Sequence, residues 1–486
     1  MPVLFQDFRA NTYSRRHTVY SKIKRVTRDG YYTSNDFFGN NFTSNLLGLN
    51  DNSKDFFSNS CRDVIYSSDL DALIACGANA EGDKRNNLST FMYSTDHGVS
   101  WAFAKDSFPS LGQYNGSGSY LVISDSEIFC GGSGGESLGN YVSLMKSSDG
   151  DNWTPVTACT LDEVLSMTTS GYGQILVWGL ANATPTKLLL STNNGDTFNE
   201  VNVASILTDD IRNILLYHIN NSFYAVITLN NLSIVVLTIS VANANTGGDD
   251  INNWTNITSN FEDGAGNPIT LTGYSTSMYH DVVNNNTFIL FGGGSNFIFY
   301  STDGLNFIRT LVDTNIKAAT KIVYSPTDTS YYLAVAYPES DTEPGNYTIM
   351  YKCLATDISS FVPYINTHDI NLKVTSLKDV IINSVTDFYL GTNTINLVVA
   401  NGFKRHDNND YQYEYYGLVN VDIATGTINN TVQTKIDNVS KLIYNNPNLL
   451  VCTESSSQRF TNNDTIYYQG PSSTSLQETE HSADTS

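Results

Sequence analysis

A short polar pattern recurs along this chain, and each copy follows an apolar run of the kind found in β-strands. The fullest copy is STDHGVSW at 94–101, directly after the run FMY at 91–93. Two shorter copies are SSDGDNW at 147–153 and STDGLNF at 301–307, and a copy with asparagine in place of aspartate is STNNGDTF at 191–198. Degenerate copies lie near Trp254, Asp357 and Asp422. This repetition constrains the fold more than any other feature of the sequence.

Each residue type in the pattern has a physical reason to close a hairpin. An Asp or Asn side-chain oxygen accepts from backbone N–H groups two residues on, and glycine supplies a backbone angle that other side chains disfavour. The aromatic then packs back over the hairpin. The residues that carry the pattern are Ser94, Asp96, Gly98 and Trp101; Ser147, Asp149, Gly150 and Trp153; Ser191, Asn193, Gly195 and Phe198; and Ser301, Asp303, Gly304 and Phe307.

These hairpins close a larger unit that repeats about every fifty residues, as propeller blades do. The expected innermost strands begin near Val64, Tyr114, Val164, Ile211, Met278, Ile322, Val380 and Leu442. The pattern resembles the Asp-box (BNR-repeat, sialidase-like) β-propeller superfamily over roughly residues 64–468. The resemblance implies an all-β fold of seven or eight blades, each a four-stranded antiparallel sheet. It also places the Asp boxes on the blade peripheries, away from any ligand.

A propeller needs its last sheet paired to leave no open edge. The run 18–26 (TVYSKIKRV) is the expected N-terminal strand that closes the last sheet. The expected domains are a basic N-terminal arm at 1–16, the propeller at 17–469 and a polar tail at 470–486. The tail is rich in Ser, Thr and Glu and has almost no apolar residues, so we expect it to be disordered.

The charge balance bears on partners. The net charge of −22 opposes binding to nucleic acid, yet the segment from Arg9 to Arg28 carries seven basic residues and no acid between Arg9 and Arg28. This segment is either a docking arm for an acidic partner or a solvated stretch. The sequence shows no signal peptide and no run long enough to cross a bilayer. No His, Cys or acidic set has metal-ligand spacing, so we expect no metal and no cofactor.

Four acids stand next to the expected innermost strands, and they are the best candidates for catalysis. They are Asp63, Glu163, Asp210 and Asp379. Equivalent positions on different blades would place them around one mouth of a central channel. Like charges held close together raise at least one pKa, as a general acid requires. The alternative is that an acidic protein places carboxylates in many loops, spread and solvated.

Two further features of the sequence bear on a ligand site. Sialidases on this scaffold clamp a carboxylate with three converging arginines, but six of the eleven arginines here precede residue 63 and the chain has no Arg-Ile-Pro. Tyr411, Tyr413 and Tyr415 alternate on one face of an expected strand. That row would either stack on sugar rings or pack between blades.

Together these observations predict a non-enzymatic protein. Low charge and abundant Asn, Ser, Thr and Tyr resemble viral structural proteins, so the first hypothesis is a virion component such as a phage tail, nozzle or host-recognition propeller. It would be made in the host cytoplasm and would bind neighbouring subunits. A host glycan is a further ligand that the sequence neither requires nor excludes. The alternative is a glycoside hydrolase that uses the channel-mouth acids, and a third is a cellular scaffold propeller.

Overall fold

The computed structural model describes most of the chain between residues 60 and 453. The described residues are 31–34, 42–45, 60–78, 89–96, 101–109, 116–134, 136–137, 140–181, 186–292, 297–312, 315–316, 318–337, 347–373, 382–391, 394–401, 404–405, 412–413, 416–429, 435–436, 439–445, 448–453, 465–468 and 477–480. They divide into two compact units. Unit 1 comprises Met1–Leu46, Tyr274–Asp303 and Ile308–Ser486, and unit 2 comprises Leu47–Gly273 and Gly304–Phe307.

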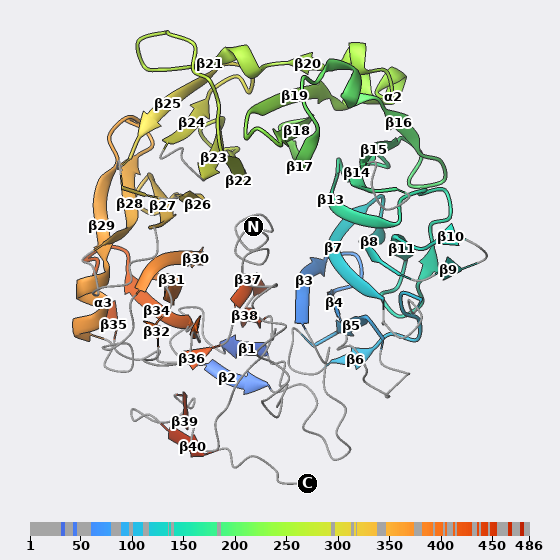
Figure 1. Ribbon diagram of the computed structural model, residues 1–486. Coiled ribbons are helices and arrows are strands. Elements are labelled where there is room, and N and C mark those ends of the chain that lie inside the picture. Colours follow the sequence, from blue (N-terminus) through green and yellow to red (C-terminus); the bar gives the residue numbers. More distant parts are fainter. Residues whose placement is uncertain are drawn as a thin grey trace. The chain divides into compact units, whose positions relative to one another are not determined.

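Unit 2 is built from four-stranded antiparallel groups in which successive strands are neighbours (Figure 1). The first group is β3 (Ser60–Ser67), β4 (Ala72–Ala78), β5 (Phe91–Ser94) and β6 (Ala102–Phe103). The second is β7 (Ser117–Ser124), β8 (Glu127–Ser133), β11 (Leu144–Ser147) and β12 (Thr154–Pro155). The third is β13 (Glu163–Thr169), β14 (Ile175–Leu180), β15 (Thr186–Ser191) and β16 (Asn199–Val201). The fourth is β17 (Ile211–Ile219), β18 (Ser222–Leu229), β19 (Ile234–Ser240) and β20 (Thr255–Asn256).

Unit 1 repeats the same arrangement. Its groups are β22 (Tyr274–Asp281), β23 (Asn286–Gly292), β24 (Phe297–Ser301) and β25 (Phe307–Leu311); β26 (Ala318–Ser325), β27 (Ser330–Ala336), β28 (Thr348–Leu354) and β29 (Val362–Asn366); and β30 (Ile382–Leu390), β31 (Thr394–Asn401), β34 (Tyr416–Asp422) and β35 (Ile428–Asn429). A last sheet has the order β2 (Phe42–Asn45), β1 (Tyr31–Ser34), β38 (Asn448–Thr453) and β37 (Val439–Asn445). The protein is therefore all-β, with repeated four-stranded antiparallel sheets of the kind that form propeller blades.

The last sheet contains N-terminal strands, as expected, but not the predicted segment. β1 pairs antiparallel with β38, with Tyr31 opposite Cys452. The predicted run 18–26 lies outside the described residues, as do the arm at 1–16 and the segment from Arg9 to Arg28. Within the tail at 470–486, β40 (Gln477–Glu480) pairs with β39 (Thr465–Tyr468). Antiparallel pairing needs only backbone groups, so a polar segment without apolar residues can still form it.

The first strand of every group carries a bulge. The register shifts between Cys61 and Asp63 in β3 and between Gly118 and Tyr120 in β7, and similar shifts occur in β13, β17, β22, β26, β30 and β37. A bulge inserts one unpaired residue, which bends the strand and redirects a side chain. Arg62 and Ser119 are the inserted residues in β3 and β7.

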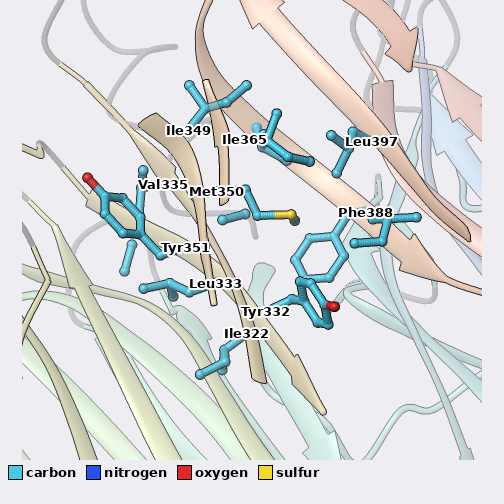
Figure 2. Close-up of a cluster of buried hydrophobic side chains, with 14 of the residues drawn as sticks. Ile322, Tyr332, Leu333, Val335, Ile349, Met350, Tyr351, Ile365, Phe388 and Leu397 are labelled. Carbon is cyan, nitrogen blue, oxygen red and sulfur yellow. The ribbon is translucent and has the colours of Figure 1, made fainter. Parts of the chain in front are cut away.

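Second strands such as β27 and β14 are buried on both faces. Every residue of β27 is buried, and β14 is buried except at its last residue. In unit 1, Ile322, Leu333, Met350 and Phe388 from four different strands pack with Tyr332 in one core (Figure 2). Full burial of such side chains contributes about 1.5–3 kcal/mol each, so packing of sheet against sheet is a main source of stability in this fold.

Helices play a minor part. α2 (Val241–Gly247) begins with Ser240 as its N-cap and lies in the connection between β19 and β20, and α3 (Thr367–Lys373) follows β29. None of the helices in the described part of the chain is long and apolar enough to span a bilayer.

Candidate functional site

The predicted acid Asp63 lies inside β3, beside the bulge, rather than just before the strand. Its Oδ1 accepts from the backbone N–H of Val64 and its Oδ2 from the backbone N–H of Leu121 on β7, each at 2.9 Å. The carboxylate is partly buried and joins the first strands of two neighbouring sheets. Asp63 is therefore partly buried and hydrogen-bonded to backbone, because the bulge turns its side chain toward backbone N–H donors.

Arg62 points from the same bulge toward β7. Its Nη1 donates to Ser119 Oγ at 2.7 Å and to Ser117 Oγ at 3.3 Å. Ser117 Oγ lies 3.3 Å from Ser133 Oγ on β8, and Ser133 is the backbone partner of Glu163 at the start of β13. A guanidinium and several hydroxyls thus gather near the starts of β3 and β7, and Glu163 begins the next first strand, β13.

Glu163, the first residue of β13, is also partly buried. Burial raises the pKa of Glu163, and the positive charge of Arg62 opposes that shift. The backbone of Glu163 is tightly packed, because a Cβ added at Gly179 would lie 1.8 Å from the Glu163 carbonyl oxygen. Only glycine at 179 allows the two strands to approach this closely.

The other two predicted acids do not join this group within the described residues. Asp210 directly precedes β17 and is exposed, as expected, and its carbonyl oxygen accepts from the backbone N–H of Asn230 at 3.0 Å. Asp379 lies outside the described residues. The three predicted acids that the structure describes, Asp63, Glu163 and Asp210, therefore occupy three different environments rather than equivalent ones.

Unit 1 joins its first strands with residues that sequence reasoning missed. Lys321 Nζ on β26 pairs with buried Asp387 on β30 at 2.6 Å and donates to the Phe388 carbonyl at 2.8 Å. Thr320, the inserted residue of the β26 bulge, donates to the Val385 carbonyl at 2.9 Å. A bulge position can be inferred from the sequence only when the pairing register of the two strands is known. The pattern of apolar residues does not determine that register to within one residue.

The predicted hairpins share one side-chain hydrogen bond. In each, the serine Oγ donates to the oxygen of the Asp or Asn two residues later, at 2.8 Å for Ser94–Asp96, 3.2 Å for Ser147–Asp149, 3.1 Å for Ser191–Asn193 and 2.8 Å for Ser301–Asp303. Gly98 lies outside the described residues, and Trp101 is partly buried. Asparagine at 193 makes the same bond through its amide oxygen, which explains why it substitutes for aspartate.

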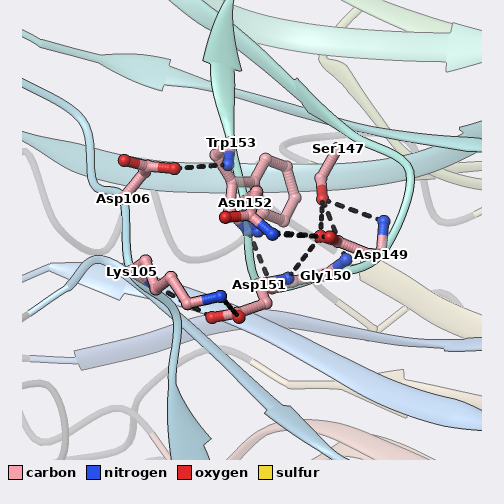
Figure 3. A network of polar contacts seen from close by, with 8 residues as sticks. All are labelled: Lys105, Asp106, Ser147, Asp149, Gly150, Asp151, Asn152 and Trp153. Carbon is pink, nitrogen blue, oxygen red and sulfur yellow. Dashed lines mark hydrogen bonds and ion pairs between the residues drawn. The ribbon is translucent and has the colours of Figure 1, made fainter.

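The hairpin between β11 and β12 shows the full network (Figure 3). Asp149 Oδ1 accepts from the backbone N–H groups of Asp151 at 2.9 Å and Asn152 at 2.7 Å. Slight desolvation would raise the pKa of the exposed Asp149, but these hydrogen bonds and the Asn152 side chain outweigh it and lower the pKa to about 2. Gly150 has a φ of +78°, which a non-glycine residue adopts only with strain.

Trp153 packs beyond its own hairpin, which corrects the sequence expectation. Its Nε1 donates to the Gly150 carbonyl at 2.9 Å, but its ring stacks on Phe91 of β5 with centroids 3.9 Å apart. Its backbone N–H donates to Asp106 Oδ2 at 2.9 Å, and Lys105 pairs with Asp151 (Figure 3). Phe91, Lys105 and Asp106 belong to the preceding group, so this hairpin fastens two sheets together.

Other connections between a third and a fourth strand also contact the neighbouring sheet. Asn194 Nδ2 donates to Glu127 Oε2 on β8 at 2.8 Å. Tyr364 on β29 donates to the Ile423 carbonyl at 2.9 Å in the degenerate copy. Phe307 stacks on Phe261 at 4.8 Å. Within each unit, these connections therefore join neighbouring sheets, and their polar groups make the hydrogen bonds that join them.

The tyrosine row and possible metal ligands complete the set of candidates. Tyr411 and Tyr415 of the tyrosine row lie outside the described residues, and Tyr413 is in β33 (Gln412–Tyr413). Across the part of the chain that the structure describes, no three His, Cys, Asp or Glu side chains form a metal-binding group.

No family model matches the chain, and no curated protein matches its sequence. Solved structures do match it. YCF48 from Cyanidioschyzon merolae is 14% identical over 71% of this chain and 94% of that chain, with a TM-score of 0.41. Sqt1 from Saccharomyces cerevisiae is 10% identical over 82% and 96%, with a TM-score of 0.48. The periplasmic gluconolactonase PpgL from Pseudomonas aeruginosa is 10% identical over 74% and 94%, with a TM-score of 0.42. Values this low carry no inference about activity.

Proposed function

We propose that this chain is an eight-bladed Asp-box β-propeller that works by binding, as a structural component of a virion, and that it is not an enzyme. The observation that carries the proposal is the Asp63 carboxylate. Both of its oxygens accept from backbone N–H groups, on β3 and on β7. A carboxylate committed to joining two strands is poorly placed to transfer protons to a substrate.

The repeated architecture supports the propeller and its blade number. Eight four-stranded groups occur among the described strands, four in unit 2 and four in unit 1. Their number favours eight blades over seven. The Ser–Asp and Ser–Asn hydrogen bonds of four hairpins support the Asp-box resemblance.

Composition supports the virion assignment. Charged residues make up only 15% of the chain, while Tyr alone contributes 30 residues. The basic segment from Arg9 to Arg28 would dock on an acidic neighbouring subunit, in a particle assembled in the host cytoplasm. A cellular scaffold propeller would share the fold but not this setting.

The test is the setting of the gene, followed by a docking measurement. Neighbouring genes for portal, tail or capsid proteins, and the chain itself in purified particles, are the expected results. Reversing the charges of Arg15, Arg16 and Arg28 should weaken docking to the particle, more strongly at low salt. A chromosomal setting without virion genes, and no such chain in particles, would contradict the assignment.

One observation favours the glycoside hydrolase as a second candidate. Burial raises the pKa of Glu163, as a general acid requires. Release of sugar from a glycan by the purified protein, lost in Glu163→Gln without loss of folding, would establish this candidate in place of the first.

A further inference from the structure

We propose that Arg62, Ser119, Ser133 and Glu163 form a binding site for a neutral carbohydrate, which they recognise through a pair of adjacent hydroxyl groups. This inference rests on the proposed binding function and names its ligand class. The four residues come from β3, β7, β8 and β13, all in unit 2.

Geometry gathers these groups at one end of the first strands. The bulges of β3 and β7 insert Arg62 and Ser119, whose side chains meet at 2.7 Å. Ser117 links this pair to Ser133 through its hydroxyl, and Ser133 is the strand partner of Glu163. Bulges commonly redirect side chains next to ligand sites.

Part of the hydrogen-bonding capacity of the group is left for a ligand. Arg62 has five N–H donors, and its only described hydrogen bonds are those of Nη1 to Ser117 and Ser119. Among the described residues, no side chain or backbone group hydrogen-bonds or ion-pairs with the Glu163 carboxyl. Asp63, by contrast, is occupied by backbone donors. The site therefore offers donors from Arg62, an acceptor at Glu163 and hydroxyls between them.

Charge selects the class of ligand. An anionic ligand would meet the Glu163 carboxylate and a protein of net charge −22. A cationic ligand would meet Arg62. Adjacent sugar hydroxyls both donate and accept, so they satisfy the guanidinium and the carboxylate together without an added charge.

The test measures binding of neutral sugars to the full chain. Methyl glycosides of glucose, galactose, mannose and N-acetylglucosamine would be screened by saturation-transfer NMR, with affinities from titration calorimetry. Arg62→Gln and Glu163→Gln should each weaken binding of the best ligand at least about tenfold, the effect of losing a charged hydrogen bond. Arg62→Lys should lose most of the affinity while keeping the charge, because lysine lacks the planar fork.

Matched controls come from the Lys187–Glu200 ion pair of β15 and β16, which is 2.7 Å long. Lys187→Gln and Glu200→Gln remove the same charges elsewhere in unit 2 and should leave affinity unchanged. Thermal unfolding of every variant separates lost binding from lost folding.

Absence of binding to every sugar at millimolar concentration, or equal affinity in wild type and Glu163→Gln, would overturn the inference. Docking to particles would then still stand as the proposed function. Tighter binding of sulfated or sialylated sugars than of neutral ones would also overturn it, since the ligand would then be an anion.

Discussion

The outer hairpins and the starts of the first strands are both rich in polar side chains, but they use them differently. In the β11–β12 hairpin, Asp149 accepts from its own turn, while Asp151 and Trp153 contact the preceding sheet. At the starts of β3, β7 and β13, Asp63 is similarly occupied, whereas within the described residues the Glu163 carboxyl has no hydrogen-bond partner and Arg62 uses only Nη1. The comparison teaches that a repeated polar motif can be wholly structural, while an irregular polar group beside it retains capacity for a ligand.

The largest loss of stability should come from removing the contact between the β11–β12 hairpin and the preceding sheet. Trp153→Ala removes a buried ring stacked on Phe91 and should lower the free energy of unfolding by about 3–5 kcal/mol. Urea denaturation would measure it. Sugar binding by the folded fraction should be unchanged, and a stable variant without binding would show that the hairpin is itself a site.

Asp63→Ala should come next. It leaves the N–H groups of Val64 and Leu121 without their acceptor, at a cost of about 1–3 kcal/mol. Asp63→Asn, which keeps one acceptor oxygen, should lose less. Equal stability of wild type and the alanine variant in urea would show that the carboxylate does not join the two strands.

Asp149→Ala should cost less, about 1 kcal/mol, because the carboxylate is exposed and its hydrogen bonds are screened by water. The pKa of Asp149 is lowered to about 2, so its contribution is present above about pH 4 and lost as the pH falls toward 2. Unfolding curves between pH 2 and 6 should show wild type and variant converging at the acid end. A constant difference across this range would contradict the account.

Glu163→Gln should change the free energy of unfolding least, and at pH 7 it should raise it rather than lower it. The raised pKa of Glu163 means that the folded chain holds this proton more tightly than the unfolded chain. Its contribution to stability is therefore greatest below the ordinary value of 4.5 and falls as the pH rises through the folded pKa. The glutamine variant should be the more stable at pH 7 and not at pH 4. Destabilisation at pH 7 would indicate that the carboxylate has a protein partner.

Sequence predicted the repeated sheets well because apolar runs and hairpin residues are local signals. The expected start near Val164 lies one residue inside β13, and Ile211 is the first residue of β17. The start near Tyr114 precedes β7 by three residues, since Gly116 and Gly118 weaken the strand pattern there. The position of Asp63 and the role of Arg62 could not be predicted, because a bulge depends on register between strands rather than on residue type. The stacking of Trp153 on Phe91 joins positions 62 residues apart, and no local pattern specifies it.

The most direct test of the central claim is a long incubation of the purified chain with glycans that include sialosides, β-glucans and neutral oligosaccharides, followed by chromatography of released sugars. Because Asp63 joins strands and the outer carboxylates close turns, we expect ligands to be recovered intact and no new reducing ends. Release of sugar that disappears in Glu163→Gln or Asp210→Asn, while the variant remains folded, would contradict the account and identify the chain as an enzyme.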